Sequence, residues 1–163
     1  MPPRLRPVPT APDISASSEP QAVVEAFLSA LAEPDIAAAA ALLDDHVRYV
    51  NVGLPPIRGR RATTRVLGLL EGKASFEVYL HAIAADAGTV LTERTDVLVF
   101  GPVRLQFWVT GRFDVRDGRI TLWRDSFDYL DVARSLVRGL AGAVVPVLRP
   151  AAPASGDVAP GRH

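Results

Sequence analysis

The sequence of 163 residues contains no cysteine, only three histidines and no excess charge of either sign. The absence of cysteine excludes disulfide bonds, catalysis by a thiolate and zinc sites with sulfur ligands. The histidines, His46, His81 and His163, are not spaced as a metal-binding pair, so we expect no metal site. The 18 basic and 18 acidic residues balance, which argues against a nucleic-acid partner.

Long hydrophobic runs are also missing. No stretch of 18 apolar residues is present, so no membrane span is expected. The N-terminal region carries arginines but no apolar stretch of signal-peptide length, and we therefore expect a cytoplasmic protein. The sequence has neither a Gly-x-Ser-x-Gly elbow nor a P-loop, so it gives no support to a covalent serine hydrolase scaffold or to a nucleotide site.

Proline is concentrated at the two ends of the chain. Ten of the 14 prolines fall in residues 1–20 or 146–163, and both ends are poor in large apolar side chains. We predict a flexible N-terminal tail over 1–18, one folded domain over 19–148 and a flexible C-terminal tail over 149–163. The apolar content of 48% is sufficient for a sizeable core in a domain of this length.

Within the domain, the hydrophobic periodicity predicts helices first and a long run of strands afterwards. We expect helices over about 19–31, 35–43, 60–71 and 130–148, and strands over 46–52, 76–82, 89–100, 103–115 and 119–127. Turns at Gly101-Pro102 and Asp117-Gly118 join the last three strands as consecutive hairpins. This order predicts an α+β domain with a largely antiparallel sheet. If the sheet is strongly curved over the helices, it encloses one deep pocket.

Polar residues stand out in three of these strands. Tyr49 and Asn51 fall in the first strand, Arg94 and Asp96 in the third, and Asp125 in the last. Side chains at positions i and i+2 of a strand point to the same face of the sheet. If the three strands are neighbours, then two carboxylates, a guanidinium, a phenol and an amide converge in one pocket.

This set of groups can perform acid–base chemistry on a bound water. The planar fork of Arg94 can bind both Asp96 and Asp125 at once. In an apolar pocket a neutral trio costs less than a trio of net charge −1, so one aspartate should hold a proton near neutral pH. The pair would then provide one acid and one base, which suits the opening of an epoxide by water without a covalent intermediate.

Each motif taken alone also has a simpler explanation. An Arg-x-Asp pair on a strand is commonly a surface or interface salt bridge, and Asp125 could be a capping or loop carboxylate. Tyr49 could be a core or rim aromatic, and Asn51 a turn residue at the end of a strand. It is their joint occurrence that points to a site.

The joint pattern resembles the limonene-1,2-epoxide hydrolase family. The matching segments are Tyr49-Val50-Asn51, the Thr-Glu-Arg-x-Asp-x-Leu motif at 92–98, and the Gly-Arg-Ile-Thr-x-Trp-Arg-Asp-x-Phe-Asp motif at 118–128. The resemblance runs from about Val24 to Val145 and is greatest to actinobacterial members with an apolar C-terminal helix. It implies that the folded domain is a homodimeric, metal-free and cofactor-free enzyme that hydrates epoxides to vicinal diols in one step. It also implies a curved, mixed six-stranded sheet, related to the nuclear-transport-factor-2-like, ketosteroid-isomerase-like and SnoaL-like cones.

The resemblance implies a role for each of the five polar residues. Asp125 would be the general base on water and Asp96 the general acid. Arg94 would bridge the two aspartates and could contact the epoxide oxygen. Tyr49 and Asn51 would hold the nucleophilic water.

The apolar wall of the pocket follows from strand alternation. Leu98 shares the face of Arg94 and Asp96, Phe107 and Val109 lie on the neighbouring strand, and Phe127 shares a face with Asp125; all four are candidate substrate-binding residues. The sequence leaves small cyclic terpene epoxides and larger lipid or sterol epoxides as alternatives. An isomerase or polyketide-cyclase-like enzyme, or a non-catalytic binding module, is the alternative function on the same fold.

Overall fold

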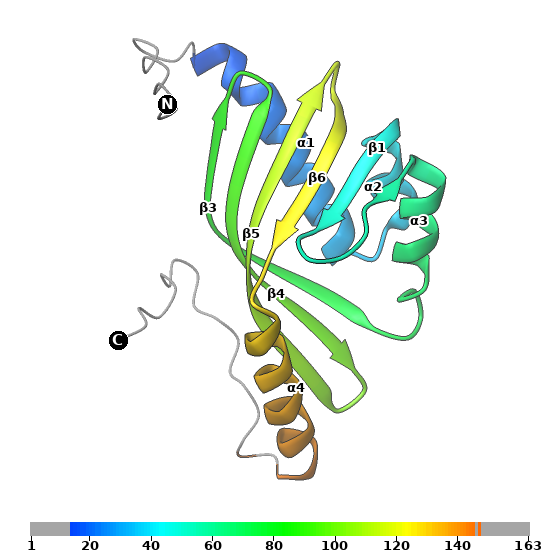
Figure 1. Ribbon diagram of the computed structural model, residues 1–163, viewed down its shortest axis with the longest axis vertical. Coiled ribbons are helices and arrows are strands. Elements are labelled where there is room, and N and C mark those ends of the chain that lie inside the picture. The colour runs from blue at the N-terminus through cyan, green and yellow to red at the C-terminus, as the bar shows by residue number, and fades with distance from the viewer. Residues whose placement is uncertain (1–13, 146, 148–163) are drawn as a thin grey trace, which may run out of the picture.

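The computed structural model describes residues 14–145 and 147, which form a curved sheet with helices packed on it (Figure 1). The helices are α1 (Ile14–Ala32), α2 (Ile36–Ala41), α3 (Arg60–Gly68) and α4 (Tyr129–Val144). The strands are β1 (Leu43–Asn51), β2 (Ile57–Arg58), β3 (Ser75–Asp86), β4 (Thr89–Phe100), β5 (Val103–Arg116) and β6 (Arg119–Ser126). The sheet order is β2-β1-β6-β5-β4-β3, with β1 parallel to β6 and all other neighbours antiparallel. The predicted α+β fold with a mixed six-stranded sheet is confirmed.

The strand boundaries differ from the prediction where the alternation of side chains is interrupted. β4 has the predicted bounds, whereas β3 continues four residues beyond the predicted end at 82. A register shift between Leu80 and Ala82 places a bulge at His81, and a bulge reverses which residues face the core. The two-residue strand β2 was not predicted, because two residues are too few to show a period.

Helix α1 begins earlier than the sequence predicts. The serine and proline residues at 17–20 indicated a start near residue 19, but α1 begins at Ile14 and includes Pro20. Proline is favoured in the first helical turn, yet here the helix continues through it although one backbone amide is lost from the helical ladder. The predicted N-terminal tail therefore overlaps α1 at residues 14–18. Its remainder, 1–13, and the predicted tail 149–163 lie outside the described residues.

The hairpin turns are formed by the residues that the sequence singled out. Asp117 and Gly118 both have positive φ, 49° and 69°, as the mirror-image turn of a two-residue hairpin requires. Gly101, at φ 54°, makes the turn between β4 and β5. These two turns fix the register of three adjacent strands, and this register sets the positions of Asp96 and Asp125.

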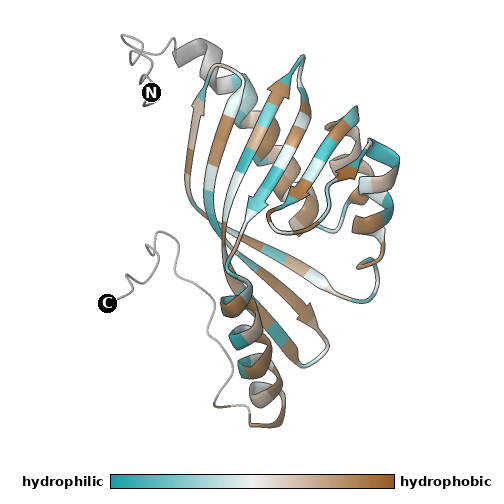
Figure 2. Cartoon of the chain, viewed as in Figure 1, coloured by the Kyte–Doolittle hydropathy of each residue, from teal (hydrophilic) through white to brown (hydrophobic). Residues whose placement is uncertain are grey.

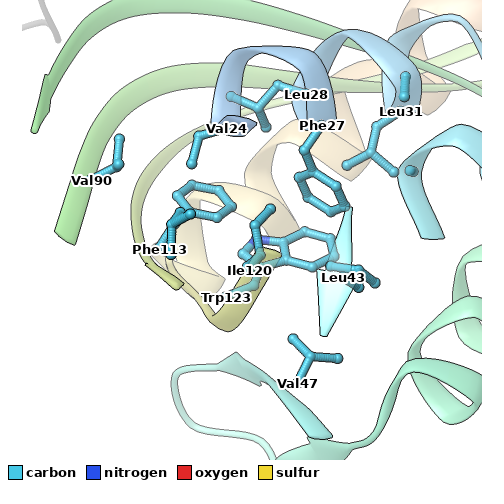
Figure 3. Packing of buried hydrophobic residues seen from close by; sticks show 13 residues of the cluster. Val24, Phe27, Leu28, Leu31, Leu43, Val47, Val90, Phe113, Ile120 and Trp123 are labelled. Carbon is cyan, nitrogen blue, oxygen red and sulfur yellow. The ribbon is translucent and has the colours of Figure 1, made fainter. Parts of the chain in front are cut away.

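The core lies between α1 and the concave side of the sheet (Figure 3). Phe27 of α1 meets Trp123 of β6 edge to face at a centroid distance of 4.9 Å, and Phe113 of β5 at 6.1 Å. Val24 and Ile120 pack around these rings and, like Phe27, are fully buried. Burial of each such side chain contributes about 1.5–3 kcal/mol to folding. The core therefore fixes α1 over the strand that carries Asp125.

Helix α4 covers an edge of β5 that β6 leaves unpaired (Figure 1). The β5–β6 ladder reaches only as far as Thr110. In the part of β5 that precedes Thr110, the Gln106 amide donates a hydrogen bond to the Ser135 hydroxyl at 2.7 Å. In the same part of β5, the carbonyl of Arg104 lies against Gly139. The helix thus uses its small residues to approach β5 closely, while most of its large apolar residues are exposed. Figure 2 shows that hydrophobic residues predominate along α4.

We predict opposite effects of alanine at two helical glycines. A Cβ on Gly139 would lie 2.6 Å from the Arg104 carbonyl oxygen, so Gly139→Ala should displace α4 and lower the free energy of unfolding by about 1–3 kcal/mol. A Cβ on Gly68 in α3 would meet no atom within 4 Å, so Gly68→Ala should raise it by about 0.5 kcal/mol. Urea denaturation of both variants measures the difference, and equal stabilities would contradict the described fit of α4.

Candidate active site

Arg94 and two aspartates form a buried trio at the centre of the sheet. Arg94 Nε and one terminal nitrogen donate to the Asp96 carboxylate at 2.9 and 3.2 Å. The same terminal nitrogen lies 2.7 Å from Oδ2 of Asp125. Residue exposures are 1% for Arg94, 4% for Asp96 and 5% for Asp125. The predicted bridge between the two carboxylates is therefore present in the structure.

The backbone prepares a space for the guanidinium. Arg94 also donates from its other terminal nitrogen to the Thr92 hydroxyl at 3.2 Å. Gly111 on β5 lies directly opposite, where a Cβ would collide with both the Arg94 nitrogen and the Thr92 oxygen. Only glycine leaves room for the guanidinium at this position, so the contribution of β5 to the site is the space beside Gly111.

The combined effects of burial and charge raise the pKa values of all three residues of the trio. Burial raises the pKa of Asp96 to about 6 against the lowering effect of Arg94, and the charge of Asp125 raises it further. Burial also raises the pKa of Asp125, while Arg94 and the hydrogen bond from Trp123 lower it. Burial lowers the pKa of Arg94, but the two carboxylates outweigh this and raise it, so Arg94 stays charged. Burial thus raises the pKa of both carboxyls, and Asp96 holds its proton up to about pH 6.

Tyr49 and Asn51 stand beside the trio on β1. Parallel pairing of β1 with β6 places Asn51 opposite Asp125 and Tyr49 opposite Trp123. The Tyr49 hydroxyl donates to the Asn51 side-chain oxygen at 3.4 Å. Burial, followed by the charge of Asp125, raises the pKa of Tyr49 to about 12, so its phenol is neutral and can donate a hydrogen bond. All five predicted polar residues lie together.

Trp123 is a contributor that the sequence analysis did not single out. Its indole nitrogen donates to Oδ2 of Asp125 at 2.8 Å, and its ring stacks on Tyr49 at a centroid distance of 3.9 Å. Oδ2 therefore receives both the indole and the guanidinium, while Oδ1 has no hydrogen-bond partner among the described residues. Trp123 and Asp125 are at positions i and i+2 of one strand, so strand alternation places both on the same face. This alternation is the sequence signal that could have identified Trp123.

A cavity of about 260 Å³ lies next to these groups. Asp96, Asp125, Tyr49 and Asn51 line it, whereas Arg94 lies behind the two carboxylates and does not. The four predicted apolar residues also line it: Leu98, Phe107, Val109 and Phe127. The helices and loops add further apolar residues, including Leu31, Ile36, Leu54, Leu67 and Leu70. The cavity therefore combines one polar wall with an otherwise largely apolar lining, as sites for apolar ligands do.

Two negative findings apply to the residues that the structure describes. No group of three or more histidine, cysteine, aspartate or glutamate side chains within 14–145 could hold a metal ion. No helix in the same part of the chain is long and apolar enough to cross a membrane.

The raised pKa of Asp96 predicts how stability depends on pH. An unfolded aspartate titrates near 3.8 and the folded Asp96 near 6, so the folded protein binds more protons between these values. The free energy of unfolding should therefore fall as pH rises through this window and then level off. Relative to Asp96→Asn, the wild type should lose on the order of 3 kcal/mol between pH 4 and pH 7.

Urea denaturation of both proteins at the two pH values measures this difference. Asp114→Asn, on the surface-facing side of β5, is the matched control and should follow the wild type. A parallel pH dependence of wild type and Asp96→Asn would contradict the assignment of the retained proton to Asp96.

Comparison with known proteins agrees with the site geometry. The model of the limonene-1,2-epoxide hydrolase catalytic domain matches residues 18–138. The chain is 50% identical over 140 residues to epoxide hydrolase EphG of Mycobacterium tuberculosis strain H37Rv, covering 86% of this chain and 94% of that protein.

Solved structures give the same result for the fold. A structure of an M. tuberculosis LEH-like epoxide hydrolase matches with a TM-score of 0.77 and 52% identity, covering 80% of this chain and 98% of that one. An NTF2-like protein from Burkholderia xenovorans LB400 matches at a TM-score of 0.62 and 17% identity, covering 74% and 97%, which shows the fold alone. The predicted relation to the nuclear-transport-factor-2-like fold is confirmed, and the chain belongs to the limonene-1,2-epoxide hydrolase family.

Proposed function

We propose that this epoxide hydrolase adds water to an apolar epoxide in one step, giving a vicinal diol without a covalent intermediate. The observation that carries the proposal is the buried trio, in which Arg94 joins Asp96, whose pKa is raised to about 6, to Asp125, whose Oδ1 has no hydrogen-bond partner among the described residues. Family membership supports the reaction, and the asymmetry of the two aspartates supports the mechanism.

Asp125 is the proposed general base. Two donors, Arg94 and Trp123, hold its Oδ2, so the unpartnered Oδ1 has lone pairs left to accept a proton from water. Tyr49 and Asn51, directly across the parallel strand pair, would hold the water for attack. Because the Tyr49 phenol is neutral, it does not compete with Asp125 for the proton.

Asp96 is the proposed general acid. In the step, the water oxygen bonds to an epoxide carbon, the strained C–O bond breaks, and the departing oxygen takes the proton of Asp96 while Asp125 takes one from water. The proton must then return from Asp125 to Asp96 before the next turnover. Of the two bonds that Arg94 makes to Asp96, that to Oδ2 is longer, because its nitrogen is shared with Asp125.

Arg94 acts through the aspartates in this proposal. It does not line the cavity, so contact with the epoxide oxygen is not part of the proposed mechanism. An isomerase would need donors aimed at an oxyanion in the cavity, and the Arg94 nitrogens, which are directed to the two carboxylates and to Thr92, do not supply them. Family membership, together with this arrangement of Arg94, favours hydration over isomerisation or cyclisation.

The proposed substrate is an apolar epoxide, and the two candidate classes are small cyclic terpene epoxides and larger lipid or sterol epoxides. The lining of Leu98, Phe107, Val109 and Phe127 supports an apolar substrate because burying hydrocarbon against it is favourable. The reaction as proposed uses water and side chains of the described residues, and it requires no cofactor.

Replacement of either aspartate should abolish turnover without unfolding the protein. Asp125→Asn removes the base and Asp96→Asn the acid, and each leaves Arg94 with one carboxylate, so the buried charge stays balanced. We expect diol formation from a limonene-type epoxide to fall by about 10²–10⁴-fold in each variant. Product analysis by mass spectrometry and circular dichroism of the variants measure activity and fold.

A single turnover in oxygen-18 water tests the absence of a covalent intermediate. Label should enter the first diol and not the protein. Label that enters the protein first would indicate an aspartyl ester and contradict the one-step mechanism. Diol formation retained by Asp125→Asn would contradict the assignment of the base.

We further propose that the chain forms a homodimer in which α4 takes part. An exposed apolar row follows α4 at alternating spacings of three and four residues, the spacing of helices that pair: Leu130, Ala133, Val137, Leu140 and Val144. Val137→Glu should therefore convert a dimer to a monomer in sedimentation, whereas Arg138→Glu, on another face of α4, should not. A monomeric wild type would contradict this proposal. The cytoplasmic location stays a prediction from the sequence.

A further inference from the structure

Tyr129 connects α4 to the loop that follows β1. Its hydroxyl donates to the carbonyl oxygen of Val52 at 2.6 Å, although the two residues are 77 apart in the chain. Its ring packs against Gly53, where φ is +97° and a Cβ would lie 3.0 Å from the ring. The start of α4 and the loop after β1 thus meet at the same end of β6 (Figure 1).

The loop after β1 follows a polar residue of the cavity lining and carries an apolar one. Asn51 precedes it, and Leu54, within it, lines the cavity while remaining 53% exposed. On the β1 side the loop is held by the Val52 amide, which donates to the Asp125 carbonyl at 2.9 Å. The Leu54 amide donates to the Asn51 carbonyl at 2.9 Å, which closes a tight turn. The hydroxyl of Tyr129 holds the middle of this turn from outside the sheet.

The Tyr129 ring also supports the cavity wall. It meets Phe127 at a centroid distance of 5.0 Å, and Phe127 meets Phe107 at 5.7 Å. Phe127 and Phe107 line the cavity, whereas Tyr129 does not. Tyr129 therefore lies one layer behind the wall and touches it at two places, the aromatic pair and the Leu54 loop.

We propose that Tyr129 is a positioning residue that sets substrate selectivity by holding Leu54 against the far end of a bulky substrate. This inference rests on the proposed function, because it takes the cavity as the epoxide site. The β1–β6 ladder holds Asn51 independently of Tyr129. Loss of the hydroxyl should therefore change substrate binding and leave the chemical step unchanged.

The test compares Tyr129→Phe with the wild type on two epoxides, a limonene-type epoxide and a four-carbon epoxide too short to need the Leu54 wall. For the limonene-type epoxide, KM should rise roughly three- to tenfold with kcat unchanged, as expected for one lost hydrogen bond. For the four-carbon epoxide, both constants should stay unchanged. Tyr79→Phe, which removes a hydroxyl bonded to Glu77 outside the cavity lining, is the matched control and should behave as wild type.

A double-mutant cycle tests whether Tyr129 acts through Leu54. If it does, Leu54→Ala and the Leu54→Ala/Tyr129→Phe double variant should have the same kcat/KM for the limonene-type epoxide. Independent, multiplying losses would overturn the inference. So would a Tyr129→Phe variant that is unchanged on both epoxides, or one that loses kcat equally on both with a lowered melting temperature. No diol from either of these epoxides, nor from a lipid or sterol epoxide, with the wild type would instead overturn the proposed function, and the inference with it.

Discussion

The burial of one arginine between two carboxylates is the constraint on which the rest of the structure depends. Taking these charges out of water costs several kcal/mol per ion, which only close pairing and complete hydrogen bonding can offset. Arg94 meets this condition, because its guanidinium donates hydrogen bonds to three strand residues, Asp96, Asp125 and Thr92. Two carboxylates against one cation leave one negative charge in excess, and burial raises the pKa of both carboxyls, that of Asp96 to about 6. Burial therefore favours the form of the trio that holds one proton.

Trp123 connects this site to the hydrophobic core. One edge of the indole packs against Phe27 in the core, its face stacks on Tyr49, and its nitrogen holds Asp125. A site built on strands and supported from behind by core side chains is held more rigidly than one built on loops. The Leu54 side of the cavity lies on a loop, and there Tyr129 supplies the support.

The sequence predicted the parts of the fold and site that depend on local periodicity. Alternation in β4 and the Asp117-Gly118 turn predicted the bounds of β4, the hairpin between β5 and β6, and the shared face of Arg94 and Asp96. It did not predict the end of β3 or the start of α1, because a bulge and an internal proline interrupt the local pattern. Strand neighbours are not encoded locally either. The convergence of Tyr49 and Asn51 with Asp125 was a conditional expectation, and the parallel pairing of β1 with β6 fulfils it. The position of α4 stayed open, since its apolar residues gave no indication that small residues would contact β5.

The pairing of β1 with β6 also bears on how the chain folds. The hairpins from β3 to β6 join neighbours in sequence, whereas Asn51 and Asp125 are separated by most of the domain. Closing so long a loop costs chain entropy before any contact rewards it, and such contacts slow folding. Until β1 arrives, β6 is an open edge available to another chain. The arrival of β1 would therefore both complete the proposed water site and cover the open edge of β6.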